Sequence, residues 1–321
     1  MKSAIEIRGL SVNYRISDTE RVHALRDISL SISQGESVAI VGESGCGKST
    51  LAGSMLNLMT ENALPDGSIR INEEDVLGRG NRELEKIRGV AAGIIFQDPG
   101  ASLNPVTTIK EQIEETILAH FPKTGREELQ KQGHKLLEET GIKDIERVYN
   151  SYPHQLSGGQ QQRVMIAIAL SCAPGILIAD EPTTALDVTV QAQIVALLKK
   201  LKKDRGLTLV LITHDLHLAL ELAERIIVMY AGEIAEDGKM RGEKDAKHPY
   251  TRALFEIIPD LTDKKKDFSV IPGELPDLRV IVDGCYFADR CGRAQEKCRH
   301  KHPDMENREG HGFRCYYPYG G

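Results

Sequence analysis

Short apolar runs alternate along the chain with segments of helix-forming residues. The clearest runs are residues 38–41, 92–96, 176–179 and 207–212, and each is followed by a glycine or by polar residues. Short continuous runs of this kind are typical of buried strands. Helices are expected at 48–59, at 161–170 and at 190–201, where Val190, Ile194, Leu197, Leu198 and Leu201 share one face.

Other stretches alternate apolar and polar residues, as half-buried strands do. This alternation occurs at residues 5–7, at 28–32 and at 69–71, and the last stretch follows a turn predicted at Pro65-Asp66-Gly67. Residues 109–140 differ, because they are rich in Glu, Lys, Gln and Leu and are divided by a proline and a glycine into two helical segments. We expect this region to be a helical insertion between the strands of the core.

The stretch from residue 37 to residue 59 combines a strand, a glycine-rich loop and a helix. Its loop, GESGCGKS at 42–49, matches the pattern G-x-x-x-x-G-K-[ST] in the context that a phosphate-binding loop requires. Glycines let backbone N–H groups approach an anion, and the helix directs its positive end to the same place. Lys48 is expected to reach the β- and γ-phosphates, and the Ser49 hydroxyl to ligate Mg²⁺. The pattern predicts binding of a nucleoside triphosphate.

Polar residues follow three other predicted elements at positions that suit phosphate chemistry. Leu-Ser-Gly-Gly-Gln at 156–160 precedes a helix and is a second potential anion site, or a simple helix cap. Asp180 and Glu181 end a strand, where Asp180 could hold Mg²⁺ and Glu181 could polarise water; a solvated turn is the alternative. His214 also follows a strand, where it could bond a terminal phosphate or have a purely structural role.

The composition restricts the classes of function. The formal net charge is −6 and the pI about 6.0, which argues against a broad nucleic-acid-binding face. No apolar run approaches the roughly 20 residues that cross a bilayer, and the first ten residues lack the apolar core of a signal peptide. We therefore expect a soluble, cytoplasmic protein that reaches a membrane only through partners. A length of 321 residues suggests about two domains.

Four of the six cysteines lie near the end of the chain, at Cys285, Cys291, Cys298 and Cys315. Disulfides between them are disfavoured in a cytoplasmic protein. Four thiolates suit zinc, although the gaps here are wider than the usual C-x₂₋₄-C spacing. Four thiolates also suit a 4Fe–4S cluster. The spacing by itself leaves zinc and iron–sulfur open.

Taken in order, these motifs resemble the ATPase subunit of an ATP-binding cassette (ABC) transporter. The matching set is the phosphate loop 42–49, Gln97, the signature 156–160, Asp180-Glu181, Asp187 and His214. More narrowly, several stretches are similar to the dipeptide/oligopeptide importer family: FQDPGASLNPVTTI at 96–109, YPHQLSGGQQQRVMIAIAL at 152–170, ADEPTTALDVTVQAQI at 179–194 and HPYTRALFEIIPD at 248–260.

The resemblance implies an α/β fold with a P-loop NTPase (RecA-like) core, an antiparallel β subdomain, an inserted α-helical subdomain at about 98–170 and a small Cys-rich C-terminal extension. The nucleotide-binding domain would comprise residues 1–235 and the extension residues 236–321. The implied cofactors are ATP and Mg²⁺.

The resemblance also implies roles for single residues. Glu181 would be the general base, His214 the γ-phosphate switch, and Gln97 a sensor of Mg²⁺ or of the lytic water that also links to the permease. Tyr14 would stack on adenine, although the residues alone leave it undecided between that role and a packing role. The Mg²⁺ ligands would be Ser49, Gln97 and Asp180. Asp187 would bridge two subunits, and the other nucleotide contacts would be Gly42, Ser44, Gly45, Cys46, Gly47, Lys48, Ser49, Thr50, Ser157, Gly158, Gly159 and Gln160.

The implied function is hydrolysis of ATP to power the uptake of di- or oligopeptides. The partners would be two integral-membrane permease subunits, a second ATPase subunit (homologous, or an identical copy in isolation) and, indirectly, an extracytoplasmic solute-binding protein, with no nucleic acid. The protein would lie at the cytoplasmic face of the membrane, held by the permease. Uptake of nickel or oligosaccharides is the alternative. A soluble mechanical ABC ATPase that acts on nucleic acid would need a long coiled coil between Gln97 and Leu156, where only about sixty residues lie.

The resemblance extends to the cysteines. Some peptide-importer ATPases with a similar GC-x-F-x-x-RC tail carry a 4Fe–4S cluster, and Gly284-Cys285, Phe287 and Arg290-Cys291 match that pattern here. This favours a 4Fe–4S cluster on the four C-terminal cysteines, with zinc as the alternative. We expect the metal to stabilise a loop-rich tail that has little core of its own, and a redox switch is the competing role.

Overall fold

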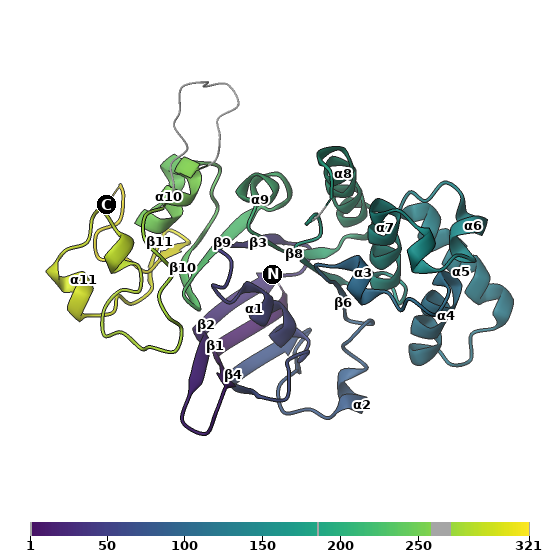
Figure 1. Cartoon of the computed structure of the whole chain (residues 1–321), viewed down its shortest axis with the longest axis horizontal. Coiled ribbons are helices and arrows are strands. Elements are labelled where there is room, and N and C mark those ends of the chain that lie inside the picture. The colour runs from purple at the N-terminus through teal and green to yellow at the C-terminus, as the bar shows by residue number, and fades with distance from the viewer. Residues whose placement is uncertain (1, 185, 258–270, 321) are drawn as a thin grey trace. The chain divides into compact units, whose positions relative to one another are not determined.

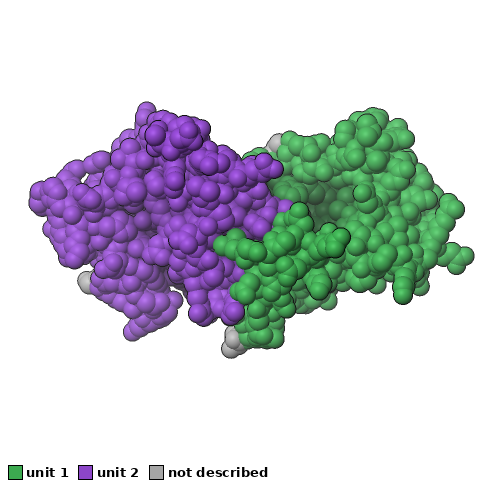
Figure 2. Space-filling model, turned by 90° about the horizontal axis from the view of Figure 1, so that it is seen from below, with its two compact units in different colours: residues 1–5, 33–36, 71–210 green, residues 6–32, 37–70, 211–321 purple. Residues whose placement is uncertain are grey.

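The computed structural model describes residues 2–184, 186–257 and 271–320 (Figure 1). The chain forms two compact units, which Figure 2 distinguishes by colour. Unit 1 comprises residues 1–5, 33–36 and 71–210, and unit 2 comprises residues 6–32, 37–70 and 211–321. The tail from residue 236 onward therefore shares a unit with the phosphate loop. Ala185 and the last residues of the 248–260 motif, 258–260, lie outside the described residues.

Unit 1 contains a pair of parallel strands at the positions of two predicted apolar runs. β6 (Ala92–Ile95) pairs with β7 (Ile176–Asp180), and Ile95 lies beside Ala179 in the register. Every residue of β7 is buried, as is usual for a parallel strand that is covered on both faces. The smaller elements of this unit are β5 (Glu74–Asp75), α2 (Asn81–Leu84), α3 (Pro99–Ser102), α6 (Ile145–Tyr149) and the 3₁₀ helix η1 (Pro153–Gln155).

The two helices expected on either side of the Pro122–Gly125 break are present as α4 (Ile109–His120) and α5 (Arg126–Glu139). Thr108 caps α4, because its hydroxyl accepts from the Glu111 backbone while the Glu111 carboxylate accepts from the Thr108 backbone. Both helices contact α7 (Gly158–Ala169). The long helix α8 (Val188–Arg205) buries four of the five predicted face residues, Ile194, Leu197, Leu198 and Leu201, and leaves Val190 only half-buried.

Three strands lie mainly in unit 2, with β1 (Ser3–Arg15) between β2 (Arg21–Ser33) and β4 (Ala63–Ile71). The turn predicted at Pro65-Asp66-Gly67 is wrong, because β4 continues through these residues. Gly67 has a φ of +99°, and a Cβ atom there would lie 2.5 Å from the carbonyl oxygen of Gly9. The glycine thus permits a close approach of two strands within unit 2.

Unit 2 also contains five neighbouring strands, in the order β11 (Glu306–Arg308), β12 (His311–Phe313), β10 (Glu233–Gly238), β9 (Arg225–Tyr230) and β3 (Ser37–Val41). β3 and β9 are parallel, whereas β9, β10, β12 and β11 are antiparallel to their neighbours. β10 pairs with β9 on one edge and with β12 on the other. Strands of the tail therefore extend the sheet that leads into the phosphate loop.

The helices of unit 2 are α1 (Lys48–Met55), α9 (Leu216–Leu222), α10 (Pro249–Ile257), α11 (Glu296–His300) and the 3₁₀ helices η2 (Glu243–Asp245) and η3 (Ala288–Arg290). α1 ends four residues earlier than the predicted 48–59, because Asn57 has a φ of +51° and the Leu58 N–H bonds back to Gly53. β8 (Thr208–Thr213) is divided by the unit boundary after Val210. None of the helices in the described part of the chain has the length and apolar character to cross a membrane.

Candidate functional site

The phosphate loop has the backbone that its glycines predict. Gly42, Gly45 and Gly47 have φ values of 155°, 83° and 104°. At Gly42, an added Cβ atom would lie 2.3 Å from the Met229 carbonyl oxygen. At Gly47, it would lie 2.5 Å from the Ala24 carbonyl oxygen. Only glycine fits at these two positions, because both the φ angle and the neighbouring backbone exclude a side chain.

Lys48 is the first residue of α1, and its ammonium group lies at the loop. The Nζ atom donates to the carbonyl oxygens of Gly42 at 2.8 Å and of Glu43 at 2.9 Å. The residue is 5% exposed. Its buried charge therefore lies beside the backbone turn that precedes the helix, which is the arrangement a phosphate-binding lysine needs.

Glu181 is held by two side chains of unit 1. Its Oε2 atom accepts from Gln97 Nε2 and from Thr184 Oγ1, each at 2.9 Å. Gln97 follows β6, and Asp180 is the buried last residue of β7, so parallel strands present these groups at the same edge. Glu181 has a φ of +46°, which is strained for a residue with a side chain. Residues with a strained backbone cluster at active sites and switch regions.

The signature turn and the start of α8 come together within unit 1. Ser157 is the N-cap of α7, and its hydroxyl accepts from the Gln160 backbone at 3.4 Å while the Gln160 side chain accepts from the Ser157 backbone. The helix thus begins at Gly158, three residues before the predicted start. Gly158 and Gly159 lie against Leu186 and Val190, respectively. Ser157 and Gly158 are exposed.

Asp187 has a clear local role, because it is the N-cap of α8. Its Oδ1 atom accepts from the Val190 N–H at 2.9 Å. The residue is exposed, and Val188 next to it is 83% exposed.

His214 lies directly after β8 and is exposed. It lines a pocket of unit 2 together with Gly42 of the phosphate loop and with Leu254 and Ile257 of α10. The structure thus brings this histidine to the loop, as its proposed contact with phosphate requires. Tyr14, the other candidate in unit 2, lies half-buried on β1.

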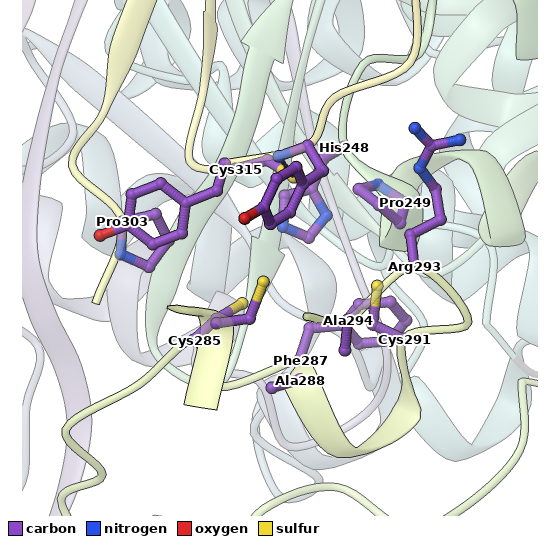
Figure 3. A pocket seen from close by; sticks show the side chains of 13 residues that line it. His248, Pro249, Cys285, Phe287, Ala288, Cys291, Arg293, Ala294, Pro303 and Cys315 are labelled. Atoms are coloured by element: carbon purple, nitrogen blue, oxygen red, sulfur yellow. Dashed lines mark hydrogen bonds between the residues drawn. The ribbon is translucent and has the colours of Figure 1, made fainter. Parts of the chain in front are cut away.

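The four C-terminal cysteines line one pocket of unit 2 (Figure 3). Cys285 precedes η3, Cys291 follows it, Cys298 lies in α11, and Cys315 follows β12. The Cys285 N–H donates to the Cys298 carbonyl oxygen at 2.7 Å, which joins two of these segments. All four are free cysteines, and the rest of the lining is largely apolar: Pro249, Phe287, Ala288, Ala294, Pro303, Tyr316 and Tyr317.

The thiols of this pocket influence one another. The pKa of Cys285 is raised to about 12 and that of Cys315 to about 11, mainly by burial and to a smaller extent by the neighbouring cysteines. In the described part of the chain, however, no group of three or more His, Cys, Asp or Glu residues has an arrangement that could hold a metal ion. The shared pocket agrees with the expected four-cysteine set, but the expectation of a metal is not confirmed.

Sequence reasoning missed a contact between the phosphate loop and the tail. The Glu43 carboxylate pairs with Arg290, and the Glu43 N–H donates to the Tyr250 hydroxyl. Burial raises the pKa of Tyr250, so its hydroxyl stays neutral. One signal was present in the sequence: a carboxylate inside an anion-binding loop calls for a cationic partner.

Family models match two parts of the chain. The model described as ABC transporter matches residues 25–184, and that described as oligopeptide/dipeptide transporter, C-terminal region, matches residues 237–298. A Brucella melitensis protein, provisionally named a peptide import ATP-binding protein, is 44% identical over 97% of this chain and 94% of its own length. The oligopeptide transport ATP-binding protein AppD of Bacillus subtilis is 40% identical over 98% of this chain and 97% of its own length.

Solved structures are similar over the larger part of the chain. A dimeric, post-hydrolysis state of the ATP-binding cassette MJ0796 with ADP and Pi is 36% identical, with a TM-score of 0.66, over 74% of this chain and 99% of its own. CbiO1 of Clostridium perfringens, part of an ABC transporter complex, is 30% identical with a TM-score of 0.63, over 74% of this chain and 89% of its own.

Proposed function

Because the chain belongs to the ATP-binding proteins of ABC transporters that carry the oligopeptide/dipeptide transporter C-terminal region, we propose that it hydrolyses ATP to power peptide import. This membership confirms the resemblance of the motifs, and the chain has the fold of an ABC ATPase cassette. The proposal rests on the likeness to a relative named for peptide import over 97% of the chain and to one named for oligopeptide transport over 98% of it. The substrates of the whole transporter would be dipeptides or short oligopeptides.

The phosphate loop is the proposed site for the triphosphate of ATP. Backbone N–H groups of residues 42–47 and the positive end of α1 would bind the phosphates, with Lys48 at the β- and γ-positions. Ser49 would ligate Mg²⁺, and Ser44 and Thr50 would contact the nucleotide. The positive φ angles of the loop glycines and the position of the Lys48 ammonium support this assignment. Tyr14 would stack on the adenine.

Hydrolysis is assigned to the carboxylates at the end of β7. Glu181 would act as the general base for the attacking water, and Asp180 would hold Mg²⁺ with Gln97. The hydrogen bond from Gln97 to Glu181 supports a joint role for these two residues. His214 would contact the γ-phosphate, which its place beside Gly42 supports. All of these residues lie at or just after the end of a strand, which sets their positions.

A second ATPase subunit is proposed to complete each nucleotide site. Ser157, Gly158, Gly159 and Gln160 of one subunit would bind the phosphates held by the phosphate loop of its partner, and Asp187 would bridge the two subunits. The exposure of Ser157, Gly158 and Asp187 supports this arrangement. A related cassette is described as a dimer with ADP and Pi. In the transporter the partner would be a homologous subunit, and the isolated protein would pair with its own copy.

We assign the protein to the cytoplasmic face of the membrane, where two permease subunits would hold it and a solute-binding protein would act from the other side. Contact with the membrane would come through these partners. The proposed domains are residues 1–235 for nucleotide binding, with the helical subdomain at about 98–170, and residues 236–321 for the extension. The start of the second family match at residue 237 supports this division.

The cysteine pocket is the proposed site of a 4Fe–4S cluster. Its four free thiols line one cavity whose other walls are largely apolar, and their number and type suit this cluster. The gaps between the four cysteines are wider than those usual at zinc sites, which favours the cluster over zinc. The cluster would cross-link segments of a tail that has little core of its own.

Anaerobic purification tests the cluster through its visible absorbance and through its iron and sulfide content. Cys298→Ser should lose the colour and lower the Tm, whereas Cys172→Ser, a buried cysteine of unit 1, should keep the colour. Protein that carries zinc, or no metal, in place of iron would overturn this assignment.

The import function is tested with the reconstituted transporter. Permease subunits that co-purify with the chain should support uptake of labelled di- and tripeptides that depends on ATP, and Lys48→Ala should abolish uptake and nucleotide binding. A transporter that moves nickel or an oligosaccharide but no peptide would remove the peptide assignment and leave the ATPase assignment intact.

A further inference from the structure

We infer that Arg290 and Tyr250, both in the C-terminal extension, are positioning residues for the nucleotide. They hold Glu43 of the phosphate loop in place, and Arg290 neutralises its carboxylate. All three residues belong to unit 2. The inference rests on the proposed binding of nucleotide by residues 42–49 and makes the extension a part of that site.

Arg290 donates a hydrogen bond to the Glu43 carboxylate from each of its two terminal nitrogens. Nη1 donates to Oε2 at 2.7 Å and Nη2 donates to Oε1 at 2.9 Å. This bidentate geometry is the strongest form of an Arg–carboxylate contact. The Arg290 side chain is only 5% exposed and that of Glu43 is 28% exposed, so water screens the pair little.

The guanidinium itself is fixed in position. Its remaining donors bond to the Pro272 carbonyl oxygen at 2.9 Å, to the Tyr230 hydroxyl at 3.2 Å and to the Ile271 carbonyl oxygen at 3.4 Å. All five N–H donors of the group are thus used. Because both the tail and β9 hold Arg290, it can impose one position on Glu43.

Tyr250 holds the backbone of the same loop residue. Its hydroxyl accepts from the Glu43 N–H at 2.9 Å. The side chain is fully buried in α10, and its ring packs on Tyr230 and on Phe287, with centroids 4.6 Å and 5.3 Å apart. Packing therefore sets the position of the hydroxyl, and through it the direction of the peptide group between Gly42 and Glu43.

The position of Glu43 also sets that of Lys48, because the two residues share a hydrogen bond. The Glu43 carbonyl oxygen accepts from Lys48 Nζ at 2.9 Å and from the Cys46 N–H at 3.3 Å. A shift of Glu43 would move both groups. Lys48 is the proposed ligand of the β- and γ-phosphates, so this shift would weaken nucleotide binding without any direct contact between Arg290 and the nucleotide.

The charge of Glu43 distinguishes the inferred role of Arg290 from a purely structural one. A carboxylate in a loop that binds a triphosphate repels the ligand unless a cation neutralises it. Removal of Arg290 would leave one uncompensated negative charge beside the phosphates. Removal of both charges would restore neutrality, so Glu43→Gln should rescue an Arg290 variant. A purely structural role of Arg290 would predict no such rescue.

The test measures the Kd of ADP with Mg²⁺ for the full chain by calorimetry, because ADP is bound and not hydrolysed. Arg290→Ala should raise the Kd about tenfold or more, the fold-change expected for loss of a hydrogen bond between charged groups. The double variant Glu43→Gln/Arg290→Ala restores neutrality but not the bidentate contact, so it should recover part of this loss, as should Arg290→Lys. Tyr250→Phe, which keeps the ring, should raise the Kd about fivefold.

Arg299→Ala is the matched control. This arginine lies in the same tail, and its side chain is 52% exposed in an ion pair with Asp289, so its loss should leave the Kd unchanged. If Lys48→Ala binds ADP as the wild type does, the proposed nucleotide site fails. If Lys48→Ala weakens binding but Arg290→Ala and Tyr250→Phe stay within twofold of the wild type, the inference fails. If Arg290→Ala does not fold, Tyr250→Phe decides by itself, and a Kd within twofold of the wild type for this variant overturns the inference.

Discussion

Glu181→Gln is the substitution that tests the proposed chemistry most directly. The amide has nearly the shape of the carboxylate, so Gln97 and Thr184 keep a partner at the position of Oε2, where both now bond at 2.9 Å. The basic group, however, is gone. Loss of a positioned general base typically slows a reaction by about 10²–10⁴, which is about 3–5 kcal/mol in the barrier.

The same substitution should cost little stability. Hydrogen bonds to a charged group contribute about 1.5–3 kcal/mol each and neutral ones about 0.5–1.5 kcal/mol. With both donors retained, we expect the free energy of unfolding to fall by about 1–3 kcal/mol. Phosphate release measures turnover, ADP calorimetry measures binding, and size-exclusion chromatography with ATP and Mg²⁺ measures pairing. The variant should bind nucleotide, accumulate as a dimer and turn over slowly.

Glu139→Gln is the control for this prediction. Glu139 pairs with Arg205 in unit 1, and the two side chains are 30% and 23% exposed. Loss of this charge should lower stability by a similar small amount and leave turnover unchanged. Hydrolysis by Glu181→Gln within tenfold of the wild-type rate would remove Glu181 from the role of base.

Three more substitutions should each lower stability, ATPase rate or ADP binding. Ser157→Ala removes the cap of α7 and should lower the free energy of unfolding by about 1 kcal/mol, measured by urea denaturation, and slow the ATPase of the paired subunits. Gly133→Ala would place a Cβ atom 2.6 Å from the buried Tyr149 ring, so overpacking of about 1–3 kcal/mol should exceed the helix-propensity gain of about 1 kcal/mol and lower the Tm. Gly47→Ala should abolish ADP binding in calorimetry, because its Cβ would meet the Ala24 backbone at 2.5 Å; retained binding would show that the loop can rearrange.

The elements next to chemical motifs were predictable because their signals are local. A run of buried residues, a glycine with positive φ and a capping serine each act within a few positions of the chain, so the strand before Gly42 and the cap at Ser157 could be read directly. The β4 error has the opposite cause. Pro65-Asp66-Gly67 has the composition of a turn, but the approach of Gly9, from a strand more than fifty positions away, decides its conformation.

The sequence by itself determined where the phosphate loop and the signature turn lie, because spacing within one loop or one helix turn sets their local geometry. Tertiary structure alone decided that the tail reaches this loop. Glu43 and Arg290 are 247 positions apart, and only the packing of β9, α10 and η3 brings their charges together. The carboxylate of Glu43 indicates that a cation lies nearby, but nothing local identifies Arg290 as that cation, since a pairing across so long a separation depends on how the intervening elements fold.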